Sequence, residues 1–225
     1  MSLFEDALFD RSTNENWHMQ FSERAALIYV LGRTAPDVSI EIGTFLGGSL
    51  RSIAAASRHV YTFDLDDRTL PGLSNVSFIA GNSLETVPPI IDQINASDRE
   101  INFILIDGDH SEAGVRNDIV NCLHYRPKTR ATIILMHDSC NPDVRRGIAS
   151  APWAECPYFH GIDLDFVAGL LFDFDGEEHL DGQIWGGLAA AVLLPEKRCG
   201  NNLVWQSPFE PSRLVLLEKS IYAAG

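Results

Sequence analysis

The 225-residue sequence has few basic residues and no long apolar run. Lysine and arginine number 17 against 31 aspartates and glutamates, and the resulting net charge of −14 argues against nucleic acid or an anionic membrane as the partner. No apolar run reaches the ~18–20 residues of a membrane-spanning helix, and no signal-peptide pattern opens the chain. We therefore expect a cytoplasmic protein.

Cysteine is also scarce. No two of the four cysteines form a Cys-x-x-Cys pair, so the sequence indicates neither a disulfide framework nor a zinc knuckle. A hydrophobic content of 45% in a chain of this length predicts one globular domain, residues 1–225, with a sizeable core.

Apolar runs rich in β-branched residues alternate with helical patterns along most of the chain. The strand-like runs are 38–42, 60–64, 76–79, 101–106 and 131–136, and the helical patterns are 23–31, 48–57, 84–94 and 112–124. This alternation predicts βαβ units and a doubly wound, mostly parallel α/β sheet. Two further runs, 166–174 and 187–194, predict a C-terminal antiparallel hairpin that completes seven strands.

Polar residues stand where four of the predicted strands end. The first strand leads through Glu41 into a glycine-spaced loop and a helix (VSIEIGTFLGGSL, 38–50), an arrangement that lets backbone N–H groups approach a cofactor. Asp64, the run Asp107-Gly-Asp-His110 and the pair His137-Asp138 follow later strands. The carboxyl ends of parallel strands converge on one crevice, so the sequence predicts an enzyme with a nucleotide-like cofactor.

With this spacing, residues 38–140 resemble class I S-adenosylmethionine-dependent methyltransferases. The segment Glu41–Leu50 is similar to the first motif of the metal-dependent catechol and caffeoyl-coenzyme-A O-methyltransferases. Asp107–His110 and His137-Asp138 are closer to the bacterial branch that holds sugar and macrolide O-methyltransferases and cephalosporin-hydroxylase-like proteins. The resemblance implies methyl transfer to a hydroxyl of a small molecule, with a sugar or glycosylated metabolite favoured, and a homodimer.

The domain is expected to have three parts. The resemblance makes 38–140 the cofactor-binding core, residues 1–35 would form a helical cover because they precede the first strand, and 141–225 would hold the last strands together with substrate or dimer contacts. The cofactor-binding residues that the resemblance implies are Glu41, Gly43, Thr44, Phe45, Gly47, Ser49, Asp64, Asn82, Ser83 and Asp107. The two loop glycines would permit the turn without crowding the ligand. Asp64 would accept both ribose hydroxyls, and Asn82 and Ser83 would border the adenine or simply cap the next helix.

Asp107 follows a strand that is apolar except for Asn102, and a carboxylate is costly there unless it binds something. By resemblance it would bind a divalent metal together with His137 and Asp138. Two carboxylates suit Mg²⁺, whereas an imidazole fits Mn, Fe or Zn better. Mg and Mn therefore both stay open, and His137 could instead act as a base or orient a ligand.

Asp109 and His110 are the candidate general bases for the acceptor hydroxyl. An imidazole titrates near neutral pH, which suits proton abstraction, although His110 could also cap the helix that follows. Four aromatic residues could wall the acceptor pocket or belong to the core: Trp153, Tyr158, Phe159 and Trp185.

Two other functions compete with methyl transfer. His137 departs from the all-oxygen metal ligands of the catechol-type enzymes, and this difference keeps open the alternative of a non-catalytic, methyltransferase-like binding protein. An NAD(P)-linked oxidoreductase is disfavoured because the chain has no Tyr-x-x-x-Lys pair.

Overall fold

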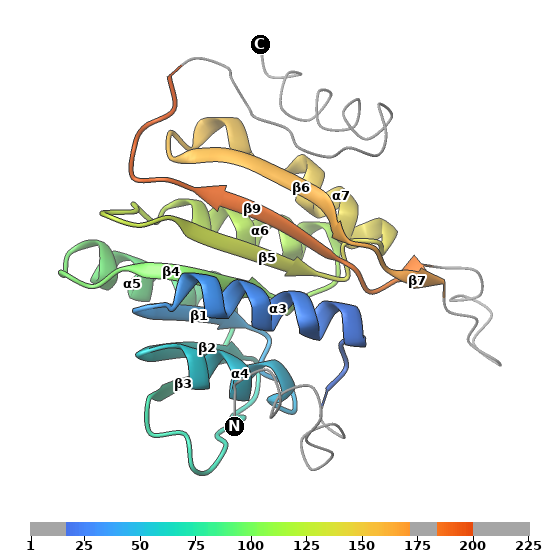
Figure 1. The fold of residues 1–225 in the computed structure, drawn as a ribbon, viewed down its shortest axis with the longest axis horizontal. Helices are drawn as coiled ribbons and strands as arrows, with labels where there is room; N and C mark the ends of the chain where they lie inside the picture. Colours follow the sequence, from blue (N-terminus) through green and yellow to red (C-terminus); the bar gives the residue numbers. More distant parts are fainter. Residues whose placement is uncertain (1–16, 172–183, 200–225) are drawn as a thin grey trace.

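The computed structural model describes residues 17–171 and 184–199. Seven strands form one sheet in the order β3-β2-β1-β4-β5-β9-β6 (Figure 1). Their bounds are β1 Val38–Ile42, β2 His59–Asp64, β3 Val76–Ala80, β4 Ile101–Ile106, β5 Thr132–His137, β6 Phe159–Val167 and β9 Leu188–Leu193. The first five are parallel, and β9 runs antiparallel to both β5 and β6. The predicted doubly wound sheet with a terminal antiparallel hairpin is confirmed.

The first strand of that hairpin lies earlier than predicted. The strand paired with β9 is β6, Phe159–Val167, whereas we expected 166–174. Gly161 and two aspartates interrupt the apolar character of β6, because this strand lies at the sheet edge and only some of its positions are buried. Beyond it, β7 (Leu170–Leu171) pairs with β8 (Ile184–Trp185), and residues 172–174 fall outside the described part.

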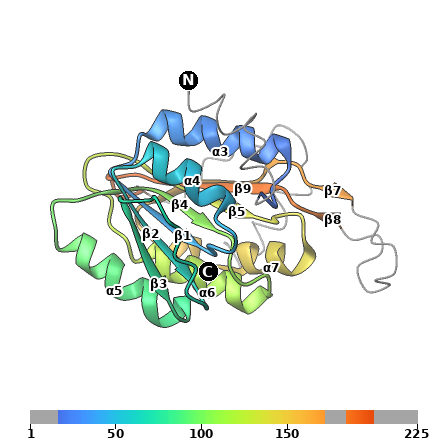
Figure 2. The ribbon, with the colours of Figure 1, turned by 90° about the horizontal axis from the view of Figure 1, so that it is seen from below.

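Helices cover both faces of the sheet (Figure 2). On one face lie α3 (Phe21–Thr34) and α4 (Gly48–Ala56), and on the other lie α5 (Ser83–Asn95), α6 (Glu112–Leu123) and α7 (Pro142–Ser150). Strand β4 shows why helices must cover both faces of the sheet. All six of its residues are buried, with Phe103 and Leu105 in one core cluster and Ile104 in the other. No helix among the described residues is long and apolar enough to cross a membrane.

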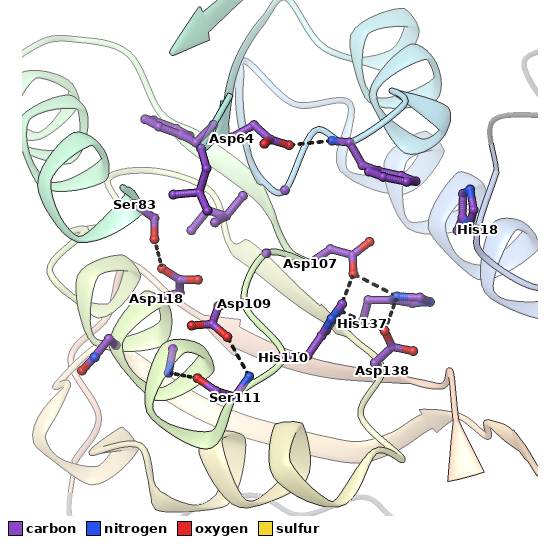
Figure 3. Close-up of a pocket in the computed structure, with 18 of the residues that line it drawn as sticks. His18, Asp64, Ser83, Asp107, Asp109, His110, Ser111, Asp118, His137 and Asp138 are labelled. Carbon is purple, nitrogen blue, oxygen red and sulfur yellow. Dashed lines mark hydrogen bonds and ion pairs between the residues drawn. The ribbon is translucent and has the colours of Figure 1, made fainter. Parts of the chain in front are cut away.

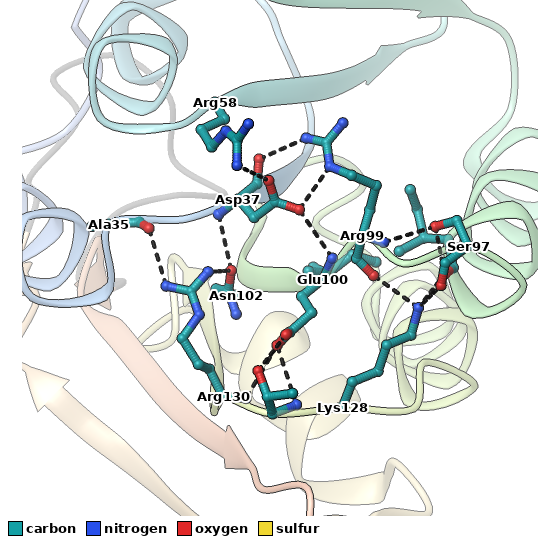
Figure 4. Close-up of polar contacts among 12 residues, drawn as sticks. Ala35, Asp37, Arg58, Ser97, Arg99, Glu100, Asn102, Lys128 and Arg130 are labelled. Atoms are coloured by element: carbon teal, nitrogen blue, oxygen red, sulfur yellow. Dashed lines mark hydrogen bonds and ion pairs between the residues drawn. The ribbon is translucent and has the colours of Figure 1, made fainter.

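Hydrogen bonds and ion pairs join the loops at the end of the sheet where the parallel strands begin (Figure 4). Asp37, just before β1, pairs with Arg99 at 2.7 Å and accepts the backbone N–H of Glu100. Lys128 donates to the carbonyls of Ile94 and Arg99. A cavity lies at the opposite end, where these strands finish.

Candidate active site

A cavity of about 1050 Å³ lies where the parallel strands end. It is lined by ten of the predicted site residues: Gly43, Phe45, Asp64, Asn82, Ser83, Asp107, Asp109, His110, His137 and Asp138. The loops after all five parallel strands contribute to it, as the topology predicts, and Figure 3 shows the polar side chains facing this space. Four other predicted residues do not line it: Glu41, Thr44, Gly47 and Ser49.

The glycine loop after β1 owes its composition to contacts within the protein. Gly43 has φ +96°, and a Cβ built there would lie 2.0 Å from the carbonyl oxygen of Asp107. A Cβ on Gly47 (φ +73°) would meet the side chain of Leu70. The positive φ angles and these contacts favour glycine at both positions, and the expected close approach of a cofactor stays a prediction.

Glu41, on β1, stabilises the start of the helix that follows the glycine loop. It is fully buried, and the Ser49 and Thr62 hydroxyls each donate to its carboxylate at 2.6 Å. The Thr44 hydroxyl contacts that of Thr62 at 2.5 Å. Burial raises the pKa of Glu41 to about 8 despite these hydrogen bonds.

Asp64 stands at the end of β2 on the cavity wall. The backbone N–H of Phe45 donates to one of its carboxylate oxygens at 2.8 Å, which ties the acid to the glycine loop. The Arg68 Nε lies 3.7 Å from the other oxygen. Phe45 itself has φ +44°, a strained value for a residue with a side chain, so the loop holds it in a defined orientation.

Asn82 and Ser83 follow β3, and the sequence left two roles open for them. The side chain of Asn82 caps α5 by accepting the Leu84 N–H, and both residues also line the cavity. Ser83 donates at 2.6 Å to Asp118 on α6, a carboxylate that is 1% exposed and lines the same cavity. Asp118 was not predicted, because one acid in a helix gives no sign that its helix faces the site.

Burial, aided by the charge of Asp109, raises the pKa of Asp118 from 3.8 to about 6 although Ser83 donates to it. The folded state therefore binds a proton more tightly than the unfolded chain. Below pH 4 Asp118 is protonated in both states and does not change the free energy of unfolding. As the pH rises, the unfolded chain loses this proton first, and the folded state becomes less stable. Above pH 6 the loss of stability reaches about 3 kcal/mol, at ~1.4 kcal/mol per pKa unit.

Asp118→Asn should consequently raise the free energy of unfolding by about 1–3 kcal/mol at pH 8, and the gain should vanish near pH 3. Urea unfolding at a series of pH values measures this difference. The exposed Asp92→Asn variant on α5 is the control, with an expected change below about 0.5 kcal/mol throughout. A gain that is independent of pH would contradict the assignment.

Asp107, His110, His137 and Asp138 converge at one end of the cavity (Figure 3). The Nδ1 atom of His137 lies 3.0 Å from Asp107 and 3.4 Å from Asp138, and His110 Nε2 lies 3.1 Å from Asp138. One ligand atom from each of Asp107, His137 and Asp138 falls within 4.8 Å of the others. The three residues predicted as metal ligands therefore lie together.

The two acids and two histidines shift one another's pKa. Burial alone would raise the pKa of Asp107 and of Asp138, but the neighbouring histidines hold both below their usual range. The same contacts outweigh burial and raise the pKa of His137 well above its usual value. Hydrogen bonds to Asp107 and Asp138 raise the pKa of His110 to about 10.

Asp109 and Ser111 organise the start of α6. Ser111, not His110, caps this helix by accepting the Gly114 N–H. Asp109 is exposed and accepts the Ser111 N–H at 2.8 Å. His110 is thus free of any capping role, and its ring stands edge-on to Trp185, with centroids 6.0 Å apart.

Glu23 on α3 is the main site residue that the sequence did not reveal. It is fully buried and lines the cavity, and its carboxylate contacts His137 Nε2 at 3.2 Å. In the sequence it is one acid in the first turn of a helix, 114 positions from its partner. Of the four aromatic residues considered for the acceptor pocket, only Trp185 lines it, since Trp153 and Phe159 are buried in the core.

The order of the strands, the antiparallel β9 and the cavity at the strand ends define the Rossmann-like architecture of class I methyltransferases. Residues 40–139 match the family model described as a methyltransferase domain. This part of the chain is therefore similar to a methyltransferase domain. No curated protein matches the chain.

Solved methyltransferases share the fold at low sequence identity. MycE, from the mycinamycin biosynthetic pathway, was crystallised with Mg, S-adenosylhomocysteine and mycinamycin VI; it has a TM-score of 0.56, 16% identity, and coverage of 92% of this chain but 57% of MycE. TomG of Streptomyces achromogenes, an O-methyltransferase involved in tomaymycin synthesis, has a TM-score of 0.53 and 13% identity, and the match covers 86% of this chain and 90% of TomG. A Bacillus cereus O-methyltransferase bound to S-adenosylhomocysteine has a TM-score of 0.51 and 16% identity, and the match covers 86% of this chain and 91% of that one.

Proposed function

We propose that the chain transfers the methyl group of S-adenosylmethionine to a hydroxyl of a small molecule, with a sugar or glycosylated metabolite as acceptor. One observation carries this proposal: the Asp107–His110 loop and the His137-Asp138 pair share one cavity with Gly43 and Asp64. The residues expected to hold the cofactor and those expected to act on the acceptor thus face one another. MycE, of the mycinamycin biosynthetic pathway, and TomG, involved in tomaymycin synthesis, support a metabolite as acceptor.

In this proposal, Asp64 binds the ribose, and Asn82 and Ser83 border the adenine. The methionine end lies along Gly43, Phe45 and Asp107, and the remaining residues of the set (Glu41, Thr44, Gly47 and Ser49) fix the loop beneath it. Methyl transfer is an in-line displacement, so its rate depends on how rigidly donor and acceptor are aligned. The buried hydrogen bonds of Glu41 and the Phe45–Asp64 contact supply that rigidity.

The donor set of Asp107, His137 and Asp138 fits a divalent cation. Two ligands at about 2.1 Å from one ion lie about 3.0–3.4 Å apart at octahedral or tetrahedral angles. His137 Nδ1 lies 3.0 and 3.4 Å from its two carboxylate neighbours. When bound there, Mg²⁺ or Mn²⁺ would polarise the acceptor oxygen and favour loss of its proton.

Of the two candidate general bases, Asp109 is placed to receive that proton. Asp109 is an exposed carboxylate at the cavity wall. With a pKa of about 10, His110 keeps its own proton at neutral pH, so in this arrangement it orients an oxygen atom by donating a hydrogen bond. His110 becomes a base only when Asp107 and Asp138 no longer accept hydrogen bonds from it.

Calorimetric titration with S-adenosylhomocysteine, with and without Mg²⁺ or Mn²⁺ and with NAD(P)H as control, tests the proposal. We expect micromolar binding of the homocysteine product alone, followed by methyl transfer to members of a sugar and glycoside panel. Binding of neither nucleotide would support a non-catalytic protein instead.

We further propose a homodimer located in the cytoplasm. The charge of −14 supports the location, and the resemblance supports the dimer. Dimer contacts were expected within residues 141–225, of which 172–183 and 200–225 lie outside the described residues. Light scattering coupled to size exclusion measures the oligomeric state.

A further inference from the structure

We infer that Glu23 positions His137 so that its Nδ1 atom serves as the nitrogen ligand of a divalent transition metal, and that this arrangement makes the site prefer Mn²⁺ to Mg²⁺. The inference rests on the proposed function for the presence of a cation. It adds a residue of α3 to the site and an order of metal preference.

The Glu23 carboxylate is held by donors from three separate segments. One oxygen contacts His137 Nε2 at 3.2 Å and accepts the Gln20 N–H at 2.6 Å, while the other accepts the Gly187 N–H. A buried carboxylate is costly unless such partners satisfy it, and Glu23 is 0% exposed. Its position is therefore fixed from α3, from the end of β5 and from the start of β9.

This contact determines which nitrogen of His137 carries a proton. An ionised carboxylate only accepts hydrogen bonds, so the Nε2 atom facing Glu23 carries a hydrogen. The opposite nitrogen, Nδ1, faces Asp107 at 3.0 Å and Asp138 at 3.4 Å, and these are acceptors as well. A positive species, either a proton or a metal ion, must lie among these three atoms.

A carboxylate that fixes a metal-binding histidine in this manner is a recurrent feature of metal sites, and its loss typically costs 10–100-fold in affinity. An imidazole nitrogen beside two carboxylates suits Mn²⁺ and later transition metals better than Mg²⁺, which prefers oxygen ligands. The His137 side chain is 7% exposed and lies between Glu23 and the two aspartates, so these contacts favour its present orientation over an all-oxygen site.

A purely structural role for Glu23 is the competing explanation. Glu23 and Gln20 form a capping box at the start of α3, and the loss of this cap could disturb the site through the helix alone. A double-mutant cycle separates the two roles, because only a positioning residue acts through His137.

The experiment is a Mn²⁺ titration of the metal-stripped full chain, followed by electron paramagnetic resonance, for the parent, Glu23→Gln, His137→Gln and the double variant. Glutamine has one acceptor oxygen, so it cannot serve both Gly187 and His137, and its amide N–H would favour the wrong tautomer. We expect the parent to bind Mn²⁺ at least about 10-fold more tightly than Mg²⁺ in competition, and Glu23→Gln to lose about 10–100-fold.

In the His137→Gln background, Glu23→Gln should cause no further loss of Mn²⁺ affinity. The spin-echo signal of a coordinated nitrogen should be present in the parent and absent from His137→Gln. Gln20→Ala, which removes the other half of the capping box, should change the affinity by less than about threefold. Binding of S-adenosylhomocysteine is measured for each variant as well.

Equal affinity for Mg²⁺ and Mn²⁺, or an effect of Glu23→Gln that persists without His137, would overturn this inference and leave the proposed methyl transfer standing. A parent that binds S-adenosylhomocysteine but neither metal would overturn the inference and the metal part of the proposed function. Failure to bind S-adenosylhomocysteine would overturn the proposed function itself.

Discussion

Asp107→Asn should lower the turnover of methyl transfer by about 10³-fold while affinity for S-adenosylhomocysteine changes by less than about threefold. The substitution keeps the shape of the side chain but removes the charge that faces both His137 and His110. The proposed metal site would lose one of its two carboxylates, and the two histidines would lose a charged hydrogen-bond acceptor. A steady-state assay with an acceptor identified in the sugar and glycoside panel measures turnover, and calorimetry with S-adenosylhomocysteine measures the affinity.

The matched control is Asp143→Asn, an exposed acid in the first turn of α7 that does not line the cavity. It should retain turnover within about twofold of the parent. If Asp107→Asn were as active as this control, the active-site assignment would be wrong. A parallel loss of turnover and product affinity would instead place Asp107 in the cofactor subsite alone.

Asp64→Ala should weaken the binding of S-adenosylhomocysteine at least about 100-fold and leave the fold intact. A carboxylate that accepts hydrogen bonds from both ribose hydroxyls contributes about 1.5–3 kcal/mol for each bond. The Phe45 N–H already ties Asp64 to the glycine loop, so the variant also releases that contact at the cavity wall. Calorimetry gives the affinity, and far-ultraviolet circular dichroism checks the fold.

Asp66→Ala provides the comparison for Asp64, because Asp66 lies two positions away in an exposed turn and does not line the cavity. Its affinity for the product should match that of the parent. Unchanged affinity in Asp64→Ala would refute the ribose assignment.

The sequence predicted those parts of the fold that depend on local pattern. Strands β1 and β4 were predicted to the residue, because both are short, fully buried segments in which apolar residues predominate. Strand β6 was misplaced, because an edge strand with Gly161 and two aspartates lacks such a run. The alternation of strands with helices then sufficed for the topology.

The same distinction applies to the site. Asp64, Asp107 and Asp138 directly follow or end parallel strands, so the topology alone brings them to one cavity. Glu23 and Asp118 reach the cavity from helices, and which side of a helix faces a cavity depends on how the helix packs against the sheet. No spacing in the sequence connects either residue to its partner.

The antiparallel course of β9 bears on how the acceptor range of this enzyme class can change. Leu188, the first residue of β9, pairs with both His137 and Val167, so the connection between β6 and β9 leaves and re-enters the sheet beside the cavity. Trp185, near its end, lines that cavity. Exchange of this connection between homologous enzymes would alter what enters the site without touching the strand ends proposed to hold the cofactor. Under the proposed function, acceptor choice and methyl-donor binding could therefore diversify separately.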